Sequence, residues 1–151
     1  MLRVDTGGKR NEEPLMAHQI SEVISYAESL GMPAEKIVHY DWMNTFYSPA
    51  FDELVIGTDI LPSPNPKSAN SALSLKASVA HEVAGHRDAA LKGFTQADEI
   101  LEEIQASIRA ARFATDLADS ERWILLRDAV DRLPEGVRMR HIRDSLNISE
   151  R

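Results

Sequence analysis

Residues 75–93, LKASVAHEVAGHRDAALKG, decide the fold because they are rich in alanine and contain no proline. Alanine is the strongest helix former, and a glycine such as Gly93 commonly closes a helix. We therefore predict that this stretch lies in a helix running from about Ala72 to Lys92. The helix carries three residues with chemical potential in its middle, namely His81, Glu82 and His86.

Two more helices are predicted downstream. Thr95 followed by Asp98 resembles a capping box and starts a helix that continues to about Ala114. Asp119 or Ser120 caps a third helix, which Pro134 ends, and residues 137–146 add a short last one. The apolar seam of the third helix is predicted to consist of Trp123, Leu126, Val130 and Leu133.

The N-terminal half of the chain has a different pattern of predicted elements. Residues 1–13 are polar and lack periodicity, so we interpret them as a flexible lead-in, as at the cut end of a longer parent protein. Pro14 opens a helix that Gly31 ends. Residues 37–40 and 54–56 are predicted strands, 44–49 a turn-rich segment and 61–71 a proline-rich surface loop. The layout predicts one α+β domain, residues 14–151, with an N-terminal helix and small sheet before a helical half that carries the site.

Composition excludes several classes of function. The 151-residue chain has a net charge of −7, which argues against binding nucleic-acid phosphates. No apolar run approaches the roughly 18 residues needed to span a bilayer, so no membrane partner is expected. The chain contains no cysteine, so any metal must be held by histidine and carboxylate. Neither a Gly-x-Ser-x-Gly elbow nor a phosphate-binding loop occurs.

The spacing of the two histidines is unusual. Neutral imidazoles are zinc ligands, and a glutamate beside one of them can act as a base toward water at the metal. Histidines at positions i and i+5 of a regular helix lie about 140° apart, too far to share one metal. A one-residue π-bulge would return His86 to the face of His81. We predict this bulge at residues 84–86, with Gly85 best able to absorb it.

The helical neighbours of His81 are all small, which leaves room for a metal and for a second helix. The alternative is that a central, tightly packed helix buries a structural histidine. The neighbours at i−7, i−4, i−3, i+3 and i+4 are Ser74, Ala77, Ser78, Ala84 and Gly85.

A third ligand is expected from the helix at 97–114. Glu103 lies on the flank of its apolar stripe, Glu102 is predicted to point to solvent, and Glu99 is a reserve candidate one turn earlier. The alternative for all three is a solvated acidic face near a helix N-terminus, where the helix dipole favours carboxylates.

The pattern His-Glu-x-x-Gly-His followed by Glu-Glu-x-x-Ala resembles the motif pair of the dipeptidyl peptidase III family of gluzincin metallopeptidases. The resemblance covers residues 80–109, with a much shorter gap between the motifs and a chain far smaller than that two-lobed enzyme. It implies a zincin-like fold, Zn²⁺ bound by His81, His86 and Glu103, and Glu82 as the base in hydrolysis of a peptide or protein substrate.

The C-terminal stretch also looks like the small metallopeptidase toxin domains of bacterial polymorphic toxins. That likeness implies a soluble module, secreted or delivered as part of a larger toxin, that acts in a target cytoplasm. It also implies a cognate immunity protein as partner.

The remaining roles are less specified by the sequence. The residue that stabilises the oxyanion could be His39, Tyr40, Tyr47, Arg87 or Arg109, and Tyr47 is our preference among them. For each of these residues taken alone, a surface or packing role is the favoured alternative. Asp88 could orient a ligand histidine, or equally could pair with Arg87 or Lys92 in solvent. The strand at 54–56 could pair with an extended substrate. The alternative function is a non-catalytic helical interaction domain whose HExxGH helix is structural or only binds metal.

Overall fold

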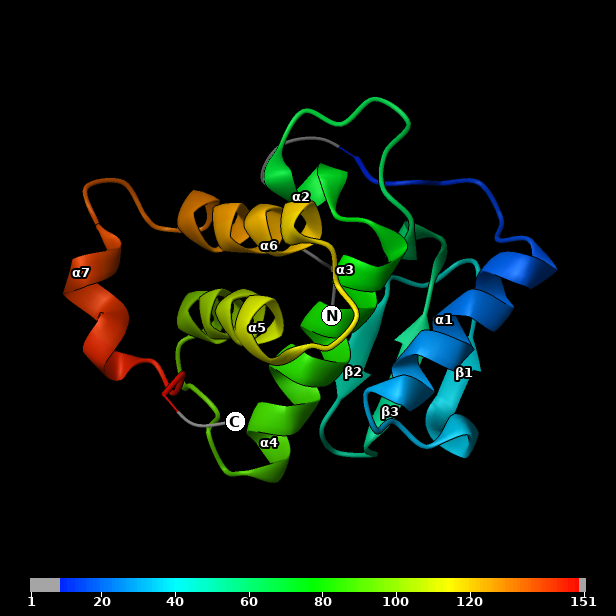
Figure 1. The fold of residues 1–151 in the computed structure, drawn as a ribbon, viewed down its shortest axis with the longest axis horizontal. Helices are drawn as coiled ribbons and strands as arrows, with labels where there is room; N and C mark the ends of the chain where they lie inside the picture. Colours follow the sequence, from blue (N-terminus) through cyan, green and yellow to red (C-terminus); the bar gives the residue numbers. More distant parts are fainter. Residues whose placement is uncertain (1–8, 150–151) are drawn as a thin grey trace.

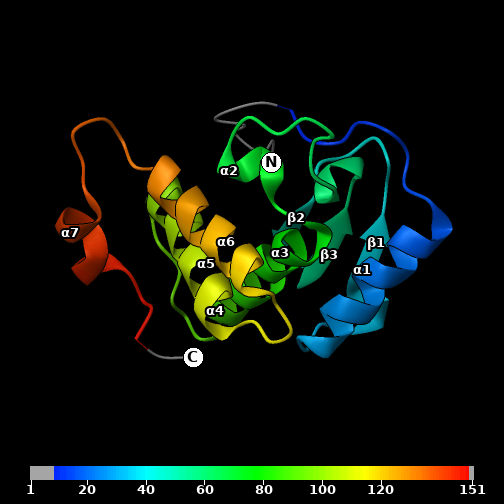
Figure 2. The same ribbon diagram turned by 45° about the horizontal axis from the view of Figure 1, so that its top comes forward.

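A continuous central helix separates a small sheet from a layer of helices in the computed structural model, which describes residues 9–149 (Figure 1). This helix comprises α3 (Leu75–Ala80), the π-helix η3 (His81–Arg87) and α4 (Asp88–Leu91). The sheet and α1 (Ala17–Ser29) lie on one side of it, and the views in Figures 1 and 2 both place α5 and α6 on the other. The predicted α+β class is confirmed.

The sheet has three strands in the order β1-β3-β2. Strand β1 (Ile37–His39) pairs parallel with β3 (Glu53–Ile56), and β2 (Phe46–Ser48) pairs antiparallel with it. Strand β2 falls in the segment that was predicted to be turns. The sequence did not indicate a strand there because the three residues before Pro49 are too few to show an alternating pattern. The central place of β3 contradicts its predicted pairing with substrate, because β3 is hydrogen-bonded on both sides.

The central helix begins later than predicted, because the chain bends at Leu73 and the hydroxyl of Ser74 then caps α3 by accepting the Ala77 N–H. A short helix, α2 (Ala69–Ala72), precedes the bend. Helix α1 ends as predicted at Gly31, whose φ of +101° is a left-handed conformation that glycine adopts without strain. Short 3₁₀ turns at Ala34–Lys36, Thr58–Ile60 and Arg143–Ser145 complete the connections.

Helices α5 (Glu99–Phe113) and α6 (Asp119–Asp131) form the outer layer, followed by the short α7 (Met139–Ile142). Asp98 itself caps α5 by accepting the N–H groups of Ile100 and Leu101, so the predicted cap at Thr95 is wrong. Helix α5 packs against both η3 and α6, and this places its side chains beside the HExxGH segment.

The predicted seam of α6 is wrong, because this face is largely solvent-exposed. Trp123, Leu126 and Val130 are 65%, 39% and 46% exposed, and the buried positions are instead Leu125, Asp128 and Ala129. Apolar residues occur nearly all round this helix, so periodicity does not select a face. The small Ala129 and the hydrogen-bonded Asp128 allow α6 to approach α5 closely.

The described part of the predicted lead-in, residues 9–13, contains one buried side chain, Arg10. Its guanidinium donates hydrogen bonds to the carbonyls of Asp59, Ile60, Asn70 and Leu73 and to the hydroxyl of Ser78. Arg10 thereby ties this segment to both ends of the proline-rich loop. Residues 1–8 of the lead-in lie outside the described part of the chain. Within residues 9–149, no helix combines the length and the apolarity needed to cross a membrane.

Candidate metal centre

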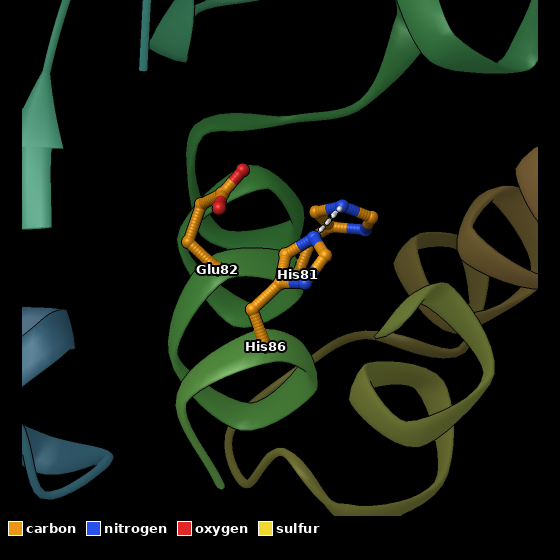
Figure 3. Close-up of side chains that lie close together, drawn as sticks. All are labelled: His81, Glu82 and His86. Carbon is orange, nitrogen blue, oxygen red and sulfur yellow. Dashed lines mark hydrogen bonds between the residues drawn. The ribbon is translucent and has the colours of Figure 1, made fainter. Parts of the chain in front are cut away.

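The predicted bulge is present as the π-helix η3, which spans both histidines and the glycine between them. The Asp88 N–H bonds the carbonyl of Val83, five residues earlier, as a π-helix requires. The extra residue brings the imidazoles of His81 and His86 onto one face, with their Nε2 atoms 3.2 Å apart (Figure 3). The i,i+5 spacing therefore allows both histidines to bind one metal ion.

Glu103 on α5 meets the two histidines across the helix–helix interface. Its Oε2 lies 2.7 Å from His86 Nε2 and 3.5 Å from His81 Nε2. Within residues 9–149, this buried oxygen receives no hydrogen bond of acceptable geometry despite these short distances. The short distances to both rings favour a positive charge between these three atoms, which either a protonated His86 or a bound metal ion supplies.

The separations match those expected around one zinc ion. Ligand atoms at ~2.0–2.1 Å from a tetrahedral zinc lie about 3.3 Å from one another. The three distances between His81, His86 and Glu103 scatter around that value. The potential ligand atoms of His81, Glu82 and His86 all lie within 4.8 Å of one another, so Glu82 is at the same centre. The residues present fit a metal held by nitrogen and oxygen donors.

Glu82 points toward the sheet rather than lying between the two imidazole rings (Figure 3). Its Oε2 accepts the backbone N–H of Tyr47 on β2 at 3.1 Å, and the residue is 4% exposed. Because Tyr47 lies on an edge strand, this N–H points away from β3 and toward the central helix. The edge strand that the sequence did not predict therefore holds the carboxylate predicted to be the base.

The Tyr47 side chain has a different environment from its backbone. Its phenol donates to Asp52 Oδ1 at 2.7 Å, and Arg87 binds the same carboxylate through two nitrogens. Burial and the Asp52 carboxylate raise the pKa of Tyr47 to about 12, so the phenol keeps its proton. That single proton is engaged by Asp52, and the oxyanion role of Tyr47 stays a prediction.

The prediction that Glu102 points to solvent is wrong. Its Oε1 lies 3.7 Å from His86 Nδ1, and its other oxygen accepts the Gln96 N–H at 2.7 Å. The chain before α5 folds over this side of the helix and brings Gln96 to Glu102, which periodicity alone does not reveal. Glu99, the reserve ligand, is exposed.

Charge pairing dominates the protonation of the centre. Burial alone would lower the pKa of His86, but the carboxylates of Glu103 and Glu102 outweigh burial and raise this pKa to about 10. Burial alone would raise the pKa of Glu103, but His86 and His81 hold it far below its usual value. In the metal-free protein Glu103 is therefore an anion paired with a protonated His86, and a metal that binds here must displace the proton of His86.

Two residues that sequence reasoning did not assign lie behind His81. Its Nδ1 lies 2.9 Å from the hydroxyl of Ser107, and that hydroxyl donates to Asp128 Oδ2 at 2.6 Å. Burial raises the pKa of Asp128, but Arg132 and Ser107 outweigh it and lower this pKa. These groups, rather than Asp88, contact the far nitrogen of His81. The available signal was the position of Ser107, one helical turn after Glu103 on the same face of α5.

Gly85 has the packing role that its position suggested. A Cβ atom built on it would lie 2.4 Å from the carbonyl oxygen of Ala106 on α5, closer than any real contact. Glycine at this position therefore allows the backbone of α5 to touch η3, which brings Glu103 within reach of both histidines.

Comparisons of the chain with models of protein families, with curated proteins and with solved structures found no match. The geometry and chemistry of the centre are therefore the basis for inferring the function of the chain.

Proposed function

We propose that this protein is a zinc-dependent peptidase of gluzincin type with a zincin-like arrangement of its site. His81, His86 and Glu103 would hold the zinc, and Glu82 would act as the general base. The observation that carries the proposal is the convergence of three ligand atoms, the Nε2 atoms of His81 and His86 and the Oε2 of Glu103, all within 3.5 Å of one another.

The ligand residues and the base have separate tasks. Zinc, when bound, polarises a substrate carbonyl and makes water more acidic. Glu82 would take the proton of the attacking water and return it to the leaving amine. The Tyr47 N–H holds the Glu82 carboxylate in place for this transfer. Tyr47 could stabilise the oxyanion only by exchanging its bond to Asp52 for one to the substrate.

The edge strand nearest the metal centre is β2, which packs against η3. Its outward-facing Tyr47 N–H is already bonded to Glu82, so an extended peptide substrate could pair along β2 only by exchanging this bond. Strand β2 thus replaces β3 as the strand expected to pair with a substrate, because β3 has another strand on each side. The side of the site occupied by His86 and Glu103 is partly accessible, with side-chain exposures of 16% and 21%.

The decisive experiment compares Glu82→Gln with Glu99→Gln, a matched change on an exposed residue. Wild-type protein reconstituted with zinc is incubated with a random-sequence peptide pool, and new termini are detected by mass spectrometry. We expect Glu82→Gln to lower the rate by at least about 100-fold while retaining zinc, and Glu99→Gln to change neither. Zinc below about a tenth of an equivalent in the wild type, or full turnover by Glu82→Gln, would contradict the proposal.

An effector role is part of the proposal, because the C-terminal stretch looks like the small metallopeptidase toxin domains of bacterial polymorphic toxins. Expression of the wild-type chain in a bacterial cytoplasm should then arrest growth, and Glu82→Gln should relieve the arrest at equal protein level. A cognate immunity protein would be a partner that restores growth. Equal toxicity of the two proteins would exclude toxicity by peptide hydrolysis.

The exposed apolar row on α6 favours a second candidate, a non-catalytic interaction domain. Three large apolar side chains on one helical face, Trp123, Leu126 and Val130, are typical of a binding surface. Under this function Trp123→Ala would abolish the biological effect and Glu82→Gln would not. The opposite pattern supports the peptidase.

A further inference from the structure

We infer that Ser107 and Asp128 are positioning residues that fix the tautomer of His81 and direct its Nε2 lone pair into the metal centre; the inference rests on the proposed zinc site. The observation behind it is a chain of hydrogen bonds from the interior to the ring. Asp128 lies on α6, Ser107 on α5 and His81 on η3, so three elements of the fold meet in this chain.

The direction of the protons follows from the donors available. A serine hydroxyl has one proton, and Ser107 donates it to the Asp128 carboxylate, which can only accept. Ser107 must then be the acceptor in its 2.9 Å contact with His81. The proton of neutral His81 is therefore assigned to Nδ1 from the hydrogen-bond network, and Nε2 carries the lone pair. That nitrogen is the one beside His86 and Glu103.

Asp128 is held as an acceptor by its other neighbours. Arg132 donates to the same Oδ2 at 3.0 Å, and the Asn70 amide donates to Oδ1 at 3.4 Å. Side chains of Asp128 and His81 are both fully buried, so water does not compete for these bonds. A histidine ligand whose other nitrogen donates toward a carboxylate is oriented and made more basic. Here the carboxylate acts through an intervening hydroxyl.

The alternative is that Asp128 and Arg132 only tie α6 to its neighbours. Three variants separate the readings: Ser107→Ala, Asp128→Asn, and Ser71→Ala as the control. Ser71 is also fully buried, but its hydroxyl bonds Ser68 and the Lys67 N–H and makes no hydrogen bond to either histidine or to Asp128. All three are first checked for folding by circular dichroism.

The first measurement is the histidine tautomer in metal-free protein labelled with ¹⁵N-histidine, read from two-bond ¹H–¹⁵N spectra at pH 8. We expect the Nδ1–H form of His81 in the wild type and in Ser71→Ala, and loss of this preference in Ser107→Ala. The second is zinc affinity by chelator competition. Ser107→Ala and Asp128→Asn should weaken it by about 10–100-fold, and Ser71→Ala should not.

Each failure has a distinct meaning. An Nε2–H tautomer in the wild type, or wild-type affinity and tautomer in Ser107→Ala, would overturn this inference and leave the zinc peptidase standing. Absence of zinc binding by the wild type would refute the proposed function, and the tautomer measurement would still decide the role of Ser107. If Asp128→Asn fails to fold, Ser107→Ala decides alone.

Discussion

Glu102 and Glu103 are adjacent in the sequence and contact different atoms of the same imidazole. Glu103 lies beside His86 Nε2, whereas Glu102 is nearer to Nδ1 and also accepts the Gln96 N–H. Because consecutive helical residues differ by about 100° in direction, the two carboxylates approach the ring from different sides. The pair could therefore bind the metal with one residue and orient His86 with the other.

We predict that Glu103→Ala reduces zinc affinity by more than about 100-fold, because it removes a ligand, and that Glu102→Ala reduces it by about 10-fold. Glu99→Ala, on the same helix but exposed, is the control and should leave the affinity unchanged. Chelator competition at constant pH measures all three. Equal affinities of the Glu103 and Glu99 variants would remove Glu103 from the ligand set.

Arg10 is the other single residue on which much of the structure depends. Its guanidinium satisfies backbone carbonyls from the turn at 58–60 and from the segment at 70–73. We predict that Arg10→Ala lowers the free energy of unfolding by about 3 kcal/mol, because it leaves these buried acceptors without their donor. Lys9→Ala, at an exposed neighbour, should change it by less than about 0.5 kcal/mol. Urea denaturation of both variants tests this.

At the scale of elements, the contact between η3 and α5 depends on the absence of a side chain at Gly85. A methyl group there would overlap the Ala106 carbonyl and push the two helices apart. We predict that Gly85→Ala costs about 1–3 kcal/mol of stability and at least about tenfold in zinc affinity.

Gly136→Ala is the matched control for Gly85→Ala. Gly136 has a φ of +78° and no neighbour within 4 Å of its added Cβ, so only backbone strain should result. Denaturation should show a loss of about 1 kcal/mol for this variant, with unchanged zinc affinity. If both glycine variants bind zinc as the wild type does, the close packing is not needed for the site.

The elements predicted best are those whose signal is local. The π-bulge follows from two histidines five apart that must share a face, and the end of α1 follows from Gly31. The predicted convergence of Glu103 on the histidines is also present, because the face of α5 that carries it is next to its apolar stripe.

Features that depend on long-range packing were not predictable in the same way. Strand β2 exists because β3 provides its hydrogen-bonding partner, and three residues alone do not indicate a strand. The predicted buried face of α6 was wrong because the face that is actually buried includes a charged residue, Asp128. Asp128 can be buried only because Ser107, Arg132 and Asn70 donate to it, and no sequence pattern joins these four positions.

At the scale of the whole molecule, the metal centre joins the layers of the fold. The central helix supplies His81, Glu82 and His86, the outer layer supplies Glu103, and the sheet positions Glu82 through Tyr47. A metal bound here would bind the folded chain more tightly than the unfolded chain, because Glu103 separates from the two histidines on unfolding. Its binding free energy is then added to the stability of the whole domain.

We predict that zinc at 100 times its dissociation constant stabilises the protein by about 2.7 kcal/mol, which corresponds to roughly 5–10 °C in Tm. Scanning calorimetry with and without a chelator measures the shift. His86→Ala should lose the shift, whereas His18→Ala, which changes a histidine outside the centre, should keep it. A shift of equal size in both variants would mean that zinc binds elsewhere.

The π-helix also has a consequence for insertions and deletions in the gene. A π-bulge contains one residue more than a regular helix needs, so removing Ala84 would restore an i,i+4 histidine pair without rotating the flanking turns. An in-frame loss of the Ala84 codon should therefore leave a folded protein that still binds zinc. The same loss at Lys76, within regular α3, would rotate one flank by about 100° relative to the other. The segment that tolerates the loss of one residue therefore lies in the middle of the metal motif, within the π-helix.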